Sequence, residues 1–267
     1  MLRKFTKMHA AGNDYIIFDC LSFPIEDPSV LANELCKRHF SIGADGLVMI
    51  LPSKIADARM RIFNADGGEA RMCGNASRCV GKWLFERKIV KKSRILLETN
   101  SGVRSLFLTV RNGAVEKIAV DMGKVEVGEM FSLDILGERY EMRGVSVGNE
   151  HQVCFVPDVD YLPLERIGRS FEQNPRYPDG VNTEFCEILG KNQLKARTFE
   201  RGSGETLACG TGACAVAAAA IFQGSCNEKE IIRISMRGGE LGVICEEGLR
   251  LRLVGDACFA FEGEIEI

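Results

Sequence analysis

The stretch RTFERGSGETLACGTGACAVAAAA, residues 197–220, predicts a strand, a glycine loop, a cysteine and then an alanine-rich helix. Cys209 stands where the loop becomes the helix, and Gly210, Thr211 and Gly212 follow it. The first turn of a helix carries backbone N–H groups without internal partners, and the helix dipole adds positive potential there. We therefore expect an anion to bind at this end, and we expect the pKa of a cysteine beside it to be lowered.

A second copy of this stretch lies 136 residues earlier. Residues 61–74 and 197–210 share the pattern R-x-F-x4-G-E-x3-C-G, six identities in fourteen positions, where composition alone predicts about one. The same offset pairs GND at 12–14 with GNE at 148–150, and Gly102 with Gly238. These matches in one register indicate a duplicated domain, in which Cys73 is the counterpart of Cys209. We expect one half at residues 1–122 with the C-terminal strand 257–267, and the other at 123–256.

Both halves read as strands with few helices. Central helices are expected at residues 75–88 and 212–222, and further helices at 28–38, which opens with a proline, and at 162–168. Asn112-Gly113 is a strong hairpin signal. The last strand, residues 257–267, is expected to return to the first half.

Composition narrows the class of protein. The 267 residues carry a net charge of −3, so no basic face for nucleic acid is expected. The longest apolar run, 213–222, is too short to cross a bilayer, and the N-terminus lacks the apolar core of an export signal. The 11 cysteines are scattered without a C-x-x-C pair and there are only 3 histidines, so we expect no metal site and a reducing, cytoplasmic location.

Two of the cysteines stand apart from the rest. Cysteine is usually a small buried hydrophobe, and Cys79, Cys154 and Cys214 keep that interpretation. Cys73 and Cys209 each follow a glycine loop and begin a predicted helix. Disulfide exchange would need a resolving thiol close in sequence. Two separate thiols facing each other favour acid–base catalysis with inversion at carbon, because one can remove a proton while the other returns one to the opposite face.

The two glycine loops are expected to bind a carboxylate rather than a phosphate. Two helix N-termini can direct N–H groups at one carboxylate and stabilise the charge that develops when the α-proton leaves. No Schiff-base lysine signature is readable, so we expect no cofactor. A phosphate cradle is disfavoured: neither loop has the lysine of a Walker A motif, and Leu207 stands where the dinucleotide motif needs its last glycine.

Four motifs resemble those of the diaminopimelate epimerase family. They are KMH at 7–9 with GND at 12–14, GADG at 43–46, MCGN at 72–75 with Cys79, and ERG at 200–202 with GETLACGTG at 204–212. The match covers the whole chain in order. The resemblance implies an α/β fold of the α+β type, with two pseudo-symmetric halves, each a mostly antiparallel sheet or barrel around a central helix. It also implies a cofactor-independent isomerase that converts LL-diaminopimelate to the meso form, for lysine and peptidoglycan precursors.

The resemblance also carries over site residues. Cys73 and Cys209 would be the catalytic pair, with His151 and Glu200 near the thiols, in a cleft between the halves. Arg201 suits a second carboxylate bidentately. The asparagines in G-N turns and the histidine also have purely structural interpretations. The full set expected to bind substrate is Asn13, Asn64, Gly74, Asn75, Asn149, Asn182, Glu200, Arg201, Gly210 and Thr211.

Three places depart from the family pattern. Ala10-Ala11 replace Gly-Leu, Ala76 replaces glycine, and Glu150 replaces proline. Glu150, beside the expected cleft, keeps open a racemase of another amino acid, histidine for example. A non-catalytic amino-acid-binding module is a third hypothesis, against which the paired cysteines argue. The expected partner is a small amino-acid substrate, and a homodimer is left open.

Overall fold

The computed structural model describes residues 2–267, and the chain divides into two compact units. One comprises Met1–Val120 with Gly255–Ile267, and the other comprises Asp121–Val254. The chain leaves the first unit within strand β8 (Ala114–Lys124) and returns at the end of β17 (Arg250–Gly255). These limits lie two residues from those expected from the sequence.

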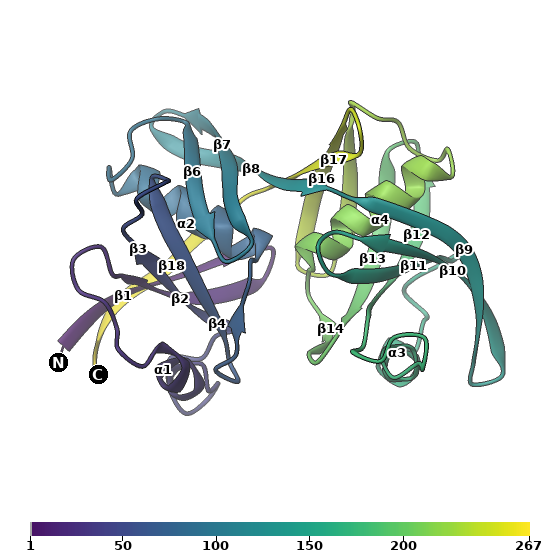
Figure 1. The fold of residues 1–267 in the computed structure, drawn as a ribbon, viewed down its shortest axis with the longest axis horizontal. Coiled ribbons are helices and arrows are strands. Elements are labelled where there is room, and N and C mark those ends of the chain that lie inside the picture. The colour runs from purple at the N-terminus through teal and green to yellow at the C-terminus, as the bar shows by residue number, and fades with distance from the viewer. Residues whose placement is uncertain (1) are drawn as a thin grey trace. The chain divides into compact units, whose positions relative to one another are not determined.

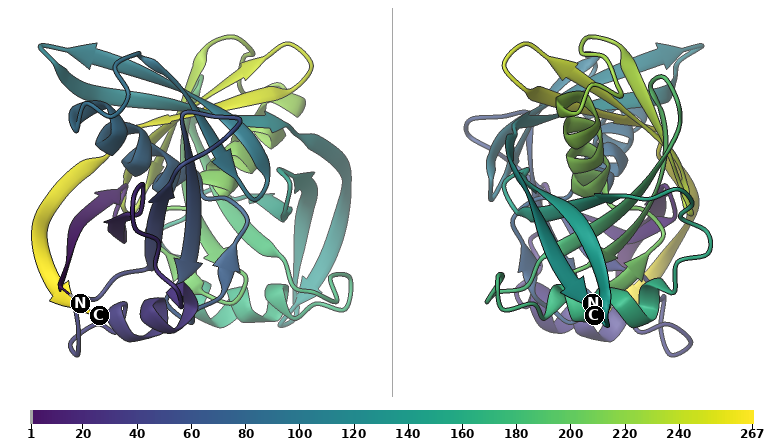
Figure 2. Two further views of the ribbon diagram at one scale, coloured as in Figure 1. Left: turned by 60° about the vertical axis from the view of Figure 1, so that its left-hand side comes forward. Right: turned by 90° about the vertical axis from the view of Figure 1, so that its right-hand side faces the viewer.

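The first unit is a curved sheet in the order β18-β1-β2-β3-β4-β6-β7-β8, with β5 paired to β4 (Figure 1). The pairs β2–β3 and β4–β6 are parallel and the others antiparallel. Parallel neighbours need a crossover, and helices α1 and α2 provide it. The two chain ends lie side by side because β18 pairs with β1, as expected (Figure 2). Besides β8, the elements are β1 (Leu2–Ala10), β2 (Asn13–Asp19), α1 (Pro28–Leu35), β3 (Gly46–Leu51), β4 (Ala58–Asn64), β5 (Glu69–Ala70), α2 (Gly74–Glu86), β6 (Arg94–Thr99), β7 (Gly102–Arg111) and β18 (Cys258–Glu266).

The second unit repeats this plan in the order β9-β10-β11-β12-β13-β15-β16-β17, with β14 paired to β13. Its parallel pairs are β11–β12, connected through α3, and β13–β15, connected through α4. Helices α1 and α2 connect the corresponding pairs of the first unit. The two-copy α+β fold is therefore confirmed. Besides β17, the elements are β9 (Glu126–Ile135), β10 (Glu138–Ser146), β11 (Glu150–Phe155), α3 (Leu164–Glu172), β12 (Asn182–Gly190), β13 (Gln193–Glu200), β14 (Gly204–Thr206), α4 (Gly210–Phe222), β15 (Ile231–Met236) and β16 (Gly239–Glu246).

A central helix lies against the sheet in each unit. The sheet of the second unit curves around α4, which contacts strands from β9 to β16 (Figures 1 and 2). Residues 213–220 of α4 are all buried, and alanine suits this place because it favours helix while letting strands approach closely. Helix α2 contacts β1, β4, β6 and β7. Within residues 2–267, no helix combines the length and apolar character needed to cross a membrane.

Most predicted elements are confirmed, and the clearest differences concern α1, α3 and β9. Asn112 and Gly113 have positive φ angles of 51° and 79°, as a tight hairpin requires. Helix α1 ends at Leu35 rather than 38. Helix α3 runs to Glu172 rather than 168, because Ile167 and Phe171 continue its buried face. Strand β9 was not expected, since its sequence alternates too weakly to predict a strand.

Candidate active site

Cys73 caps the N-terminus of α2 in extended conformation, with φ −142° and ψ 124°. Its carbonyl accepts the Ser77 N–H at 2.9 Å and the Ser77 hydroxyl at 2.8 Å, which fixes the first turn. Gly74 and Asn75 follow within that turn and are buried. Cys73 is partly exposed at a helix end whose first N–H groups have no partners within the helix, an arrangement that suits a carboxylate ligand.

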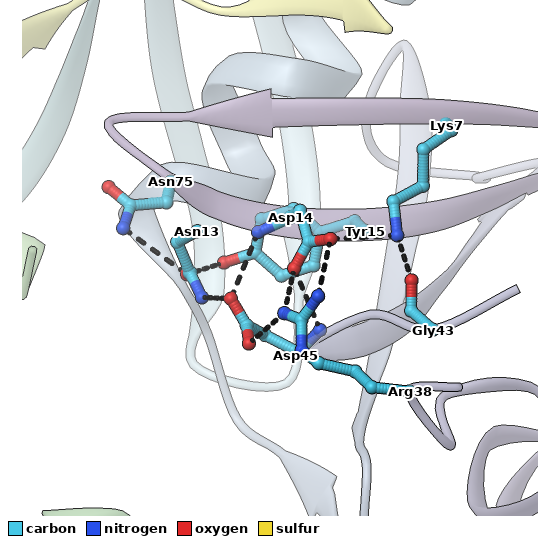
Figure 3. A network of polar contacts seen from close by, with 8 residues as sticks. All are labelled: Lys7, Asn13, Asp14, Tyr15, Arg38, Gly43, Asp45 and Asn75. Carbon is cyan, nitrogen blue, oxygen red and sulfur yellow. Dashed lines mark hydrogen bonds and ion pairs between the residues drawn. The ribbon is translucent and has the colours of Figure 1, made fainter. Parts of the chain in front are cut away.

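The Cys73 sulfur lies 3.0 Å from the hydroxyl of Tyr15. That hydroxyl donates to Asn13 Oδ1, which also accepts from Asn75 Nδ2 at 3.3 Å (Figure 3). Asn13 in turn donates from Nδ2 to Asp45 Oδ2 at 2.6 Å. No role of Tyr15 or Asp45 was expected from the sequence, yet Tyr15 connects Asn13 with Cys73 and Asp45 holds the Asn13 amide.

Asp45 and the neighbouring Asp14 belong to an ion-pair network. Asp14 pairs with Lys7 at 2.8 Å and with Arg38 at 2.6 Å, and Arg38 also reaches Asp45 at 2.8 Å (Figure 3). Burial alone would raise the pKa of Asp14, but hydrogen bonds from Arg38 and Lys7 outweigh burial and hold the pKa below its usual value. Asp45 is thereby fixed, and its carboxylate dictates which end of the Asn13 amide faces Tyr15.

Arg78 brings a buried positive charge to the same helix. Its side chain is fully buried, and it donates from Nη2 to Asn75 Oδ1 at 2.9 Å and from Nε to the Asp256 carbonyl at 3.1 Å. Among residues 2–267, Nη1 of Arg78 has no hydrogen-bond partner. Burial lowers the pKa of the guanidinium, while nearby Cys79, Cys73 and Tyr15 act in the opposite direction. Arg78 therefore orients Asn75 and adds positive charge near the Cys73 sulfur.

Cys209 caps α4 as Cys73 caps α2, with φ −110° and ψ 116°. Its sulfur accepts the Gly212 N–H at 3.3 Å and lies 3.4 Å from the Thr211 hydroxyl. Gly212 is required here, because a Cβ at this position would lie 2.7 Å from Glu184 Oε1. The thiol is buried, with 5% of the residue surface exposed.

Two carboxylates lie near Cys209, and an imidazole pairs with one of them. His151 Nδ1 lies 2.8 Å from Glu184 Oε1, with both side chains fully buried, and His151 Nε2 lies 3.2 Å from Asn149 Oδ1. Both ring nitrogens of His151 therefore face side-chain oxygen atoms. Glu200 accepts the Thr206 hydroxyl at 2.5 Å and is also hydrogen-bonded to Cys209. Glu184 was not expected in the site, although a carboxylate among the buried residues at the start of β12 was a readable signal.

The electrostatics at Cys209 contradict one expectation. Burial first, and then the charges of Glu200 and Glu184, raise the pKa of Cys209 well above its usual value. Burial likewise raises the pKa of Glu200, against the hydrogen bonds from Thr206 and Cys209. The lowered pKa predicted from the helix N-terminus is therefore wrong for Cys209, because desolvation and two nearby carboxylates outweigh the helix dipole.

The remaining predicted residues lie either in the unit that contains Cys73 or in the unit that contains Cys209. Asn64 ends β4 opposite Gly46 and is exposed. Asn182 is buried, donates to the Glu150 carbonyl at 3.0 Å and accepts the Arg201 N–H at 3.1 Å. Arg201 is exposed, and among residues 2–267 its side chain donates once, from Nη1 to the Asp179 carbonyl at 3.1 Å. Most of its guanidinium fork therefore stays available for a carboxylate.

Comparison with known proteins gives a consistent answer. Residues 5–128 and 144–254 match a family model described as diaminopimelate epimerase. The chain is 44% identical over 279 residues to the diaminopimelate epimerase of Methanococcus maripaludis, covering 99% of this chain and 100% of that protein. It is 43% identical over 278 residues to that of Acetivibrio thermocellus, covering 99% of each. A solved hydroxyproline epimerase from Agrobacterium vitis shares the fold, with a TM-score of 0.78 at 16% identity over 99% of this chain and 92% of that one.

Proposed function

The chain belongs to the diaminopimelate epimerase family, and we propose that it interconverts LL- and meso-diaminopimelate by acid–base catalysis with Cys73 and Cys209. One observation carries the mechanism: the two cysteines cap equivalent helices, α2 and α4, in the two copies of the fold. Each thiol therefore stands beside a helix N-terminus suited to a carboxylate. The activity places the protein among isomerases of amino-acid biosynthesis, with a cytoplasmic setting.

In the proposed reaction, one proton leaves the α-carbon of the substrate and another proton is added to its opposite face. The substrate α-carboxylate binds the first turns of both helices, at Gly74, Asn75, Gly210 and Thr211. One cysteine thiolate takes the α-proton and becomes a thiol, and the electron pair moves into the carboxylate, where the helix N–H groups stabilise it. The other thiol then gives its proton to the opposite face and becomes the thiolate. The reverse reaction exchanges their roles, and no cofactor takes part.

The distal amino-acid group of the substrate calls for a second set of contacts. We assign its carboxylate to Arg201, since a guanidinium with one bond in use can still offer a two-pronged contact. Asn182 holds the Arg201 backbone, and Asn64, Asn13 and Asn149 complete the polar surroundings. Asn13 and Asn149 already bond within the protein, so their contribution includes orienting Tyr15 and His151. His151 and Glu200 act on Cys209.

Glu150 favours testing a second substrate class. It is exposed and lines a hollow of about 660 Å³ in the second unit, together with Glu126, Glu129, Arg176 and Tyr177. A carboxylate in this place adds negative charge beside Asn149, where the family has proline. A racemase of another amino acid is the alternative that this residue supports.

The decisive experiment follows hydrogen exchange in D₂O with a panel of amino acids. With LL-diaminopimelate, a two-base enzyme puts solvent deuterium at the α-carbon of the meso product before the remaining LL substrate becomes labelled. Equal early labelling of both would overturn the two-thiol mechanism. Exchange only with another amino acid would move the assignment to the alternative, and no exchange with any would leave a binding module.

A further inference from the structure

Tyr15 occupies the position in the first unit that His151 occupies in the second. The offset of 136 residues relates the two, and the strand registers agree, since Tyr15 lies opposite Gly46 and His151 opposite Asn182 in the corresponding parallel pairs. Each side chain contacts Oδ1 of the asparagine two residues before it. Tyr15 is therefore the structural counterpart of the residue expected to act beside Cys209.

Within the described residues 2–267, the Tyr15 hydroxyl has two partners. Its residue surface is 2% exposed, and the hydroxyl contacts Asn13 Oδ1 and the Cys73 sulfur. Burial first, and then the neighbouring Cys73, raise the pKa of Tyr15 well above its usual value, so the phenol keeps its proton. A protonated hydroxyl can donate to one partner and accept from the other.

The Asn13 oxygen tolerates the loss of the Tyr15 bond. Asn13 Oδ1 also accepts from Asn75 Nδ2, which Arg78 orients from the other side. Asp45 fixes the Asn13 amide by accepting from its Nδ2 (Figure 3). When the Tyr15 hydroxyl turns away, this buried acceptor therefore keeps one donor and escapes the cost of an unsatisfied group.

We propose that Tyr15 is the positioning residue of Cys73: its hydroxyl accepts the S–H of the thiol while donating to Asn13, and turns to donate to the thiolate when Cys73 loses its proton. Only the hydroxyl rotates, because the phenol proton stays on oxygen throughout. The bond to the thiolate is charge-assisted and stronger than the bond to the thiol, so Tyr15 favours the proton-accepting state of Cys73. This role rests on the proposed function only in calling the sulfur catalytic.

The test is Tyr15→Phe, which keeps the ring and removes the hydroxyl. Alkylation of the full-length protein by iodoacetamide is followed against pH, and the peptide that contains Cys73 is quantified by mass spectrometry. We expect the midpoint of Cys73 reactivity to rise by about one pKa unit, so that Cys73 reacts about tenfold more slowly below the midpoint. The peptide that contains Cys209 should not change, and kcat should fall while KM changes little.

Two further proteins keep the result decisive. Tyr140→Phe removes a hydroxyl that bonds Glu138 in the second unit, and it should leave the Cys73 profile unchanged. 3-Fluorotyrosine at position 15, a stronger donor of nearly the same shape, should lower the midpoint even if Tyr15→Phe folds poorly. An unchanged or lowered midpoint in Tyr15→Phe, or no shift with fluorotyrosine, would overturn the proposal. Because alkylation reads the sulfur directly, absence of epimerase activity would count against the proposed function and leave this inference standing.

Discussion

The first turns of α2 and α4 begin alike and differ in what faces the cysteine. Cys73 meets the Tyr15 hydroxyl and has the buried cation Arg78 in its own helix. Cys209 meets Glu200 and lies near Glu184, which pairs with His151. At the positions equivalent to Glu184 and Arg78 the other unit has Val48 and Cys214. Duplication therefore supplied two similar helix ends, and substitution gave them charges of opposite sign.

This contrast suggests a division of labour within one reaction. A thiol near carboxylates is held protonated by burial and repulsion, as the raised pKa of Cys209 indicates. A sulfur near a cation and a hydroxyl donor has partners for its anionic form. If both sulfurs act on one carbon, as proposed, these unequal surroundings would let one sulfur begin as the acid and the other as the base.

The largest expected effect comes from removing either thiol. If the units contribute equally despite their different surroundings, Cys73→Ala and Cys209→Ala should each lower kcat by at least about 10³-fold, because acid and base are both needed in either direction. Steady-state epimerisation of LL-diaminopimelate measures this. Cys79→Ala and Cys214→Ala are the controls, since these thiols are buried inside the same helices. Activity near the native level in one catalytic variant would leave that unit without a chemical role.

A second difference between the units lies away from the sulfurs: Arg201 has Ala65 at the equivalent position of the first unit. Arg201→Lys should weaken transition-state binding of diaminopimelate by about 1.5–3 kcal/mol, since lysine cannot form a two-pronged contact with a carboxylate. The measurement is kcat/KM for diaminopimelate and for an amino acid without a second carboxylate. Equal losses on both substrates would assign Arg201 a structural role instead.

The duplicated pattern explains why the sequence predicted the helix starts and both cysteines. Strong local signals, such as the buried alanines of 213–220 and the hairpin at 112–113, decided the rest of the fold. The contact between Tyr15 and Cys73 was not predicted, because Tyr15 reads as the first residue of an apolar strand and Cys73 lies 58 residues away in the sequence. The direction of the pKa shift at Cys209 was not predicted for a similar reason. This shift depends on burial and on carboxylates that the fold brings close.

Glu184 tests the charge difference directly. Glu184→Gln keeps an acceptor for His151 and removes one negative charge, so the pKa of Cys209 should fall. We expect Cys209 to react with a small thiol reagent about tenfold faster at a fixed pH below its midpoint, a shift of about one pKa unit. Cys73, with Val48 at the equivalent position, should be unaffected. A Cys209 profile that does not move would mean that burial and Glu200 set its pKa without a contribution from Glu184.

The smallest effect concerns positions 76 and 212, which are equivalent and carry alanine and glycine. In α4 an added Cβ would meet Glu184 Oε1 at 2.7 Å, and this carboxylate cannot move away without losing His151. Gly212→Ala should therefore destabilise the fold by about 1 kcal/mol, because the clash outweighs the helix propensity that alanine gains. Ala76→Gly should cost about 0.5–1 kcal/mol of helix propensity. Chemical denaturation of each variant, and of Gly212→Ala combined with Glu184→Gln, measures these changes. If Gly212→Ala stabilises the protein, the first turn of α4 is not held against Glu184, and the two helix ends are more alike than their surroundings indicate.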